Sequence, residues 1–272
     1  MFGFDVACSS MGKALARYLS SPVRGFKPVA TTDMEALRRS LRPGDILLVE
    51  GNTRISTAIK YLTQSTWSHA AMYVGLIPEV AGDGPEPKVL VEADLVEGTW
   101  AVPLSAYSRM HTRICRPIGI NDVDIGQVVD FVIARLGYKY DLKNVIDLAR
   151  YLLPEPPVPA RWRRRMLALG SGEPTRAICS TLIAQAFQSI RYPILPIADA
   201  DCGTSSIATA HRKITWTQRH YSLFAPRDFD ISPYFAVVKP TLDDGFDFRH
   251  MTWSEETDDA DRGQTIDTET RN

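Results

Sequence analysis

The stretch Ser68-His69-Ala70-Ala71-Met72-Tyr73-Val74-Gly75, residues 68–75, decides the fold that this sequence predicts. Its short apolar run favours a β-strand, in which successive side chains point to opposite faces. His69 and Tyr73 therefore share one face, and Ala70 and Met72 share the other. The strand places an imidazole on the face of a sheet, where a neighbouring strand can supply its partner.

That neighbour is the strand predicted from Val89 to Ala93, after the turn-rich segment 78–87. A hairpin between the two strands brings Glu92 beside His69, where the carboxylate orients the ring and stabilises its charged form. The alternative is a histidine satisfied by a backbone carbonyl and a glutamate that ends its strand in solvent.

Outward from this hairpin, the pattern predicts an α+β fold with an antiparallel sheet. A short helix is expected to start at Thr32, with Glu35 completing a capping box. Further strands are expected at residues 46–50, 114–118 and 234–238, and further helices at 55–62, 125–136 and 178–190, the second of these closed by Gly137.

Cys179 stands at the start of the last of these helices, just before a run that is apolar on one face. The unpaired N–H groups and the positive end of the helix dipole favour the thiolate, which is the nucleophilic form of cysteine, and the same groups can hold an oxyanion. The alternative is a small buried core cysteine. Cys8, Cys115 and Cys202 have no comparable pattern around them.

The composition excludes several classes of protein. The chain has 272 residues, 44% of them hydrophobic, which is ample for a packed core, and a net charge of -1, which disfavours a general nucleic-acid binder. No apolar run approaches the length of a membrane-spanning helix. The four cysteines lack the spacing of a disulfide framework or a zinc site, and residues 1–10 lack a signal peptide pattern, so we expect a cytoplasmic protein.

The chain divides into three parts by pattern. Residues 1–40 form an N-terminal helical extension, residues 41–240 form the main domain, and residues 241–272 form an acidic tail that is expected to be disordered. A Pro/Arg-rich insertion occupies residues 150–176 of the main domain. Its Trp162 and Arg163 fit a helix that contacts an anionic membrane, whereas a solvated helix packed on the domain is the alternative.

Five motifs follow one another along the main domain. They are Pro43-Gly44-Asp45-Ile46-Leu47, the stretch 65–75, Val91-Glu92-Ala93, Gly137-Tyr138-Lys139-Tyr140-Asp141 and Cys179-Ser180-Thr181-Leu182-Ile183. Together they resemble the YaeF/YiiX-type permuted papain-like amidases of the NlpC-like superfamily of thiol hydrolases. The resemblance implies a permuted papain-like fold, with the antiparallel sheet packed against helices and the nucleophile at a helix N-terminus.

The resemblance also implies the roles of individual residues. Cys179 is the nucleophile, His69 the general base and Glu92 the orienting third member, and their chain order is immaterial to a triad that geometry defines. Tyr140 and Asp141 are expected to line the substrate pocket, although Asp141 could simply cap a helix.

Two neighbouring residues complete the expected site, and a third nearby residue, Asp45, is not part of it. Ser68 and Tyr73 lie close to the predicted base and are candidates for substrate contact. Asp45 is expected to be structural, because such side chains satisfy backbone donors in turns.

The expected function is a cysteine hydrolase that cleaves an amide, peptide-like bond through an acyl-enzyme, without a metal or an organic cofactor. A lipid acyl ester or thioester hydrolase or acyltransferase at a membrane surface is one alternative, with peripheral membrane contact through the insertion. A non-catalytic binding module on the same fold is another.

Overall fold

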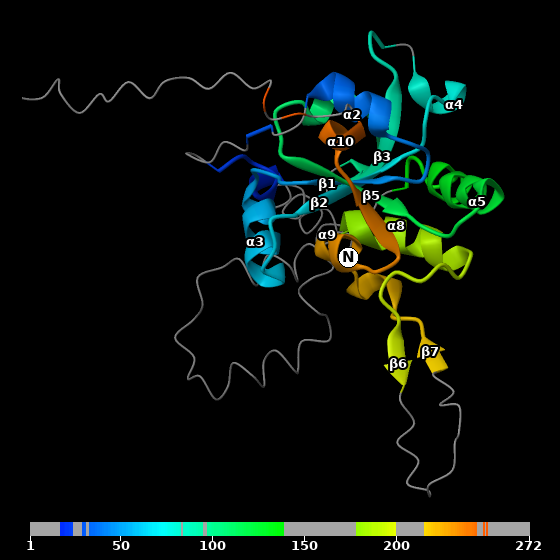
Figure 1. Cartoon of the computed structure of the whole chain (residues 1–272). Coiled ribbons are helices and arrows are strands. Elements are labelled where there is room, and N and C mark those ends of the chain that lie inside the picture. Colours follow the sequence, from blue (N-terminus) through cyan, green and yellow to red (C-terminus); the bar gives the residue numbers. More distant parts are fainter. Residues whose placement is uncertain are drawn as a thin grey trace, which may run out of the picture.

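The computed structural model describes residues 17–23, 29–30, 33–82, 84–94, 97–138, 178–199, 215–243, 247 and 249 (Figure 1). Six strands form one sheet in which every neighbouring pair is antiparallel. In spatial order they are β4 (Gly98–Pro103), β3 (Lys88–Asp94), β2 (His69–Tyr73), β1 (Ile46–Val49), β5 (Thr112–Pro117) and β8 (Phe235–Val238). This confirms the predicted α+β class with an antiparallel sheet.

Helices cover both faces of this sheet. Figure 1 shows α8 (Ile178–Ser189) and α5 (Asp122–Ile133) on one side, and α2 (Met34–Ser40) on the other. The remaining elements are α3 (Arg54–Thr63), α4 (Pro78–Ala81), α9 (Pro226–Ile231), α10 (Pro240–Asp243), the 3-10 turns η1 (Leu104–Tyr107) and η2 (Tyr221–Leu223), and a separate two-stranded ribbon of β6 (Ile197–Asp199) and β7 (Thr215–Thr217). No helix in these described ranges is long and apolar enough to cross a membrane.

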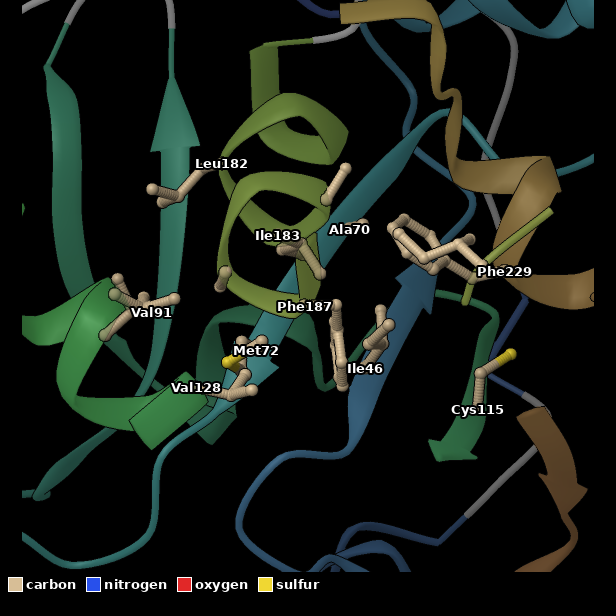
Figure 2. Close-up of a cluster of buried hydrophobic side chains, with 14 of the residues drawn as sticks. Ile46, Ala70, Met72, Val91, Cys115, Val128, Leu182, Ile183, Phe187 and Phe229 are labelled. Carbon is tan, nitrogen blue, oxygen red and sulfur yellow. The ribbon is translucent and has the colours of Figure 1, made fainter. Parts of the chain in front are cut away.

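The larger core lies between the sheet and helices α5 and α8 (Figure 2). Ala70 and Met72 of β2 point into it, as the alternation predicts, together with Leu182 and Phe187 of α8. Burying a side chain of this size stabilises the fold by about 1.5 to 3 kcal/mol. Helix α8 is therefore fixed on the sheet by its own apolar face.

The smaller core lies on the opposite face of the sheet. Leu47, Ala71 and Leu90 of the strands meet Leu37 of α2 and Leu104 of η1 there. Because Ala71 and Met72 are consecutive in β2, the two cores require the strict alternation that the sequence shows.

The β2–β3 hairpin forms as predicted, with Ala71 opposite Glu92. Its connection holds a short helix, α4, where only turns were expected. The helix predicted from Thr32 is capped instead by Asp33, whose carboxylate accepts the backbone N–H groups of Glu35 and Ala36 at 3.2 and 3.1 Å. The capping-box prediction was therefore wrong by one residue, because an aspartate follows the threonine and takes the capping position.

The outer parts of the chain are described only in places. Residues 17–19 of the N-terminal extension are helical, and Leu19 is buried. Residues 241–243 were expected to begin a disordered tail but belong to α10, which contacts α2. The insertion at 150–176, with Trp162 and Arg163, lies outside the described residues.

Candidate active site

The first half of the site comes from the β2–β3 hairpin. His69 is the first residue of β2, and Glu92 lies diagonally across from it because Glu92 pairs with Ala71. The His69 Nε2 atom lies 2.6 Å from the Glu92 Oε2 atom, which is a short, charge-assisted hydrogen bond. Their side chains are 23% and 10% exposed, so the pair is shielded from water on most sides.

The second half of the site comes from α8. Cys179 is the second residue of this helix and is only 5% exposed. Its sulfur is hydrogen-bonded to the His69 side chain and to the backbone N–H of Ala70, and it lies 3.9 Å from the Ser180 hydroxyl. Because Nε2 of His69 is held by Glu92, Nδ1 is the ring nitrogen left for the sulfur.

The three groups change one another's ionisation. Burial by itself raises the pKa of the Cys179 thiol, but the charge and hydrogen bond of His69, with smaller contributions from Ala70 and Ser180, outweigh it and lower the pKa. Burial by itself lowers the pKa of His69, but the charges of Glu92 and Cys179 and their hydrogen bonds raise it well above the ordinary value. Both shifts favour the form of the pair in which Cys179 is a thiolate and His69 an imidazolium.

A cavity of about 240 Å³ opens beside these groups, and it is large enough for part of a substrate. His69, Glu92 and Cys179 all line it. Its other lining residues are mostly polar or small, namely Ser20, Gly51, Asn52, Thr53, Ser56, Ser68, Ala93 and Asp94, with Val49, Ile55, Ile59, Tyr107 and Met110. Of the described residues that line it, none is a lysine or an arginine.

Of the other site residues predicted from the sequence, one lines the cavity, one does not, and two lie outside the described residues. Ser68 lines the cavity, and its hydroxyl accepts the backbone N–H of Gly51 at 2.9 Å. Tyr73 lies at the far end of β2, opposite Leu90, and does not line the cavity. Tyr140 and Asp141 lie outside the described residues.

Asp45 has the structural role predicted for it. Its carboxylate accepts the backbone N–H of Arg42 at 2.8 Å and binds the Arg116 guanidinium at 2.8 and 2.7 Å. Burial is the main reason that its pKa is raised, with these hydrogen bonds opposing the effect.

The sequence pattern missed Tyr107, which ends η1. Its hydroxyl donates a hydrogen bond to Oε2 of Glu92, the same oxygen that His69 contacts. Strand β4 and the turn η1, which lead the chain to Tyr107, were not predicted from the sequence, so nothing indicated that the chain returns to this face of the sheet. An aromatic residue shortly after a proline turn was the only clue in the sequence.

Cys115 contrasts with Cys179. It lies in β5 with no exposed surface, and burial raises its pKa to about 12. It is therefore an inert core thiol, and it offers an internal comparison for any measurement of thiol reactivity. Cys8 and Cys202 lie outside the described residues.

Gly51 is expected to tolerate no side chain. A Cβ at this position would meet the Ser56 and Ser68 hydroxyls at 2.3 and 2.9 Å. We therefore expect Gly51→Ala to lower the free energy of unfolding by about 1 to 3 kcal/mol, as overpacking does. Urea unfolding measures this change, and a Gly126→Ala variant is the control, because a Cβ there meets no atom within 4 Å. Equal unfolding midpoints for the two variants would contradict the close packing of Gly51.

Among the described residues, no group of three or more His, Cys, Asp or Glu side chains is placed to hold a metal ion. The His69–Glu92–Cys179 arrangement instead has the parts of a nucleophilic site, which are a nucleophile, a base and a group that orients the base.

Comparisons with known proteins agree with the family predicted from the sequence. Residues 40–151 match the family model of the permuted papain-like amidase enzymes, YaeF/YiiX, C92 family. The matched residues contain His69 and Glu92, while Cys179 lies beyond them. None of the curated proteins matches the chain.

A crystal structure described as metalloprotein yiiX from Escherichia coli O157:H7 is similar to the fold. The two share 15% sequence identity with a TM-score of 0.41, and the match covers 79% of this chain and 98% of that one.

Proposed function

We propose that this chain, whose residues 40–151 match the permuted papain-like amidases, is a cysteine hydrolase that cleaves an amide, peptide-like bond through an acyl-enzyme. Cys179 is the nucleophile, His69 the general base and Glu92 the orienting carboxylate. The observation that supports this proposal is the position of one imidazole between a carboxylate at 2.6 Å and a hydrogen-bonded thiol.

In the proposed reaction, His69 holds the proton of the Cys179 thiol, and the thiolate attacks the carbonyl carbon of the amide. The backbone N–H groups at the start of α8 face the oxyanion that forms. Collapse of the tetrahedral intermediate breaks the C–N bond, and the His69 imidazolium gives its proton to the leaving amine. A water molecule, deprotonated by His69, then attacks the thioester, and the returned proton restores the thiol as the acid product leaves.

The raised pKa of His69 suits an amide more than an activated ester. An amine leaves only when it is protonated, so a site that keeps its imidazole charged has the required acid in place. A binding module has no use for such an ion pair. The lipid acyl alternative depends on Trp162 and Arg163, and liposome flotation of the wild type and of a variant with Arg163, Arg164 and Arg165 changed to Glu remains its test.

Alkylation by iodoacetamide tests the activated thiol directly. At each pH from 5 to 9, the rate at each cysteine is read by peptide mass spectrometry. We expect Cys179 to react at an almost constant rate well below the ordinary thiol pKa of about 8.5, and Cys115 to stay unmodified, given its raised pKa. If the alkylation rate of Cys179 instead rises ten-fold for each pH unit, as that of an ordinary thiol does, the hydrolase proposal fails.

The bond that is cleaved needs a separate measurement. Matched p-nitroanilide and p-nitrophenyl ester substrates with the same short acyl groups compare amide with ester hydrolysis. We expect the wild type to release p-nitroaniline, and Cys179→Ala to release none. Ester cleavage without any amide cleavage across the series would favour the acyl ester alternative.

A further inference from the structure

We propose that Tyr107 is a positioning residue of this site, which acts through Glu92 to keep His69 charged and correctly oriented; this inference rests on the proposed function. The Tyr107 hydroxyl and the His69 Nε2 atom converge on the same oxygen, Oε2 of Glu92. Neither Tyr107 nor its hydrogen bond belongs to the Cys-His-Glu set predicted from the sequence.

The fold fixes Tyr107 as firmly as it fixes the triad. Strand β4 pairs with β3, so that Trp100 lies opposite Glu92, and η1 then returns the chain onto the same face of the sheet. Leu104, 1% exposed, anchors the start of η1 in the smaller core, and Tyr107, 7% exposed, ends it. The rings of Tyr107 and His69 are tilted by 39° with their centroids 6.2 Å apart, so the phenol is a direct neighbour of the imidazole.

A neutral donor is the suitable partner for this carboxylate. A glutamate side chain rotates about three bonds and could present either oxygen to His69, so a fixed donor on Oε2 selects one orientation. A lysine or arginine at the same place would also orient Glu92, but its charge would compete with the imidazolium for the carboxylate. Tyr107 supplies the hydrogen bond without a charge, and the negative charge of Glu92 remains directed at His69.

The test uses Tyr107→Phe, which keeps the ring and removes the hydroxyl. We expect the rate of Cys179 alkylation at pH 5 to fall about ten-fold, the size of effect that fits one hydrogen bond to a charged group. We also expect the acidic edge of the alkylation profile to move to higher pH, because Glu92 is then no longer held in the one orientation that directs its carboxylate at the imidazolium. A residue with only a packing role would change the melting temperature and leave this profile in place.

Tyr192→Phe is the matched control. Its hydroxyl is also buried and bonded, to the backbone of Ile118 and Tyr234, but it does not line the cavity. We expect this variant to lose thermal stability while its alkylation profile stays that of the wild type. If Tyr107→Phe behaves in the same way, the positioning role is wrong.

A double-mutant cycle separates action through Glu92 from any other effect. In a Glu92→Gln background, Tyr107→Phe is expected to have no further effect on the rate at Cys179. If Tyr107→Phe lowers the Cys179 alkylation rate ten-fold in both the wild-type and the Glu92→Gln background, the inference is contradicted. If Cys179 of the wild type is alkylated no faster at low pH than an ordinary thiol, both the proposed function and this inference are wrong. If Cys179 of the wild type does react fast at low pH and Tyr107→Phe has the same alkylation profile, only this inference is wrong.

Discussion

Replacing His69 by alanine is expected to remove the flat, low-pH part of the Cys179 alkylation profile. The thiol then returns toward the ordinary pKa of about 8.5, or above it because burial persists, and the thiolate fraction falls ten-fold for each pH unit below that value. A thiolate of higher pKa is intrinsically more nucleophilic, which offsets part of this loss, so we expect at least a roughly ten-fold slower reaction at pH 5. Peptide mass spectrometry of alkylated Cys179 measures it.

The sign of this pH dependence follows from the two directions of shift. The lowered pKa of Cys179 and the raised pKa of His69 both favour the ion pair, which is lost when acid protonates the thiolate and when base deprotonates the imidazolium. His220→Ala is the control, since His220 caps η2 and does not line the cavity. If His69→Ala and His220→Ala have the same Cys179 alkylation profile, His69 does not influence the thiol, and the proposed mechanism has no base.

Replacing Phe187 by alanine is expected to lower the free energy of unfolding by about 3 to 5 kcal/mol. Phe187 is completely buried on α8, and its ring meets Phe235 edge to face at 5.2 Å and Tyr192 at 5.3 Å (Figure 2 shows Phe187 between α8 and the sheet). The cost contains the lost burial of the ring and the cavity that remains. Guanidinium unfolding followed by circular dichroism measures it.

Two further variants calibrate that loss. Phe187→Leu fills part of the space and is expected to lose less stability than Phe187→Ala, whereas Val123→Ala on the exposed side of α5, where Val123 is 71% exposed, should change stability by less than about 0.5 kcal/mol. If Phe187→Ala cost no more than Val123→Ala, α8 would not be held by its apolar face, and the position of Cys179 would need another explanation.

The sequence could predict the elements whose patterns are regular. Alternation in β2 and β3 gave the hairpin, and the helical spacing of apolar residues gave α3, α5 and α8. The edges were less accurate, because β2 ends at Tyr73 although the apolar run continues to Leu76, which is 70% exposed. The N–H of Val74 still bonds to Val89 of β3, and the chain then leaves the sheet at Gly75, whose φ of 83° lies in the left-handed region that favours glycine.

The candidate site was predictable from the order of its motifs and not from single residues. Alone, a cysteine at a helix start can be a core thiol and a histidine on a strand face can be satisfied by a backbone carbonyl, but the five motifs together indicated the pair, and the structure places Cys179 and His69 in contact. Tyr107 could not be found in this way, because buried tyrosines are common and its partner is reached only through β4 and η1, a path with no periodic pattern. Tyr73 has the right face of the strand but the wrong end, and spacing along one strand cannot show which end the cavity occupies.

The order of the site residues along the chain has a consequence for how the protein is made. His69 and Glu92 belong to two strands joined by residues 74–87, while Cys179 arrives with a helix from much further along the chain. During synthesis the N-terminal segments emerge first. The His69 imidazole and the Glu92 carboxylate can therefore pair on the ribosome before Cys179 is available, and a chain that stops before residue 179 carries the imidazole and carboxylate of the candidate site without its thiol.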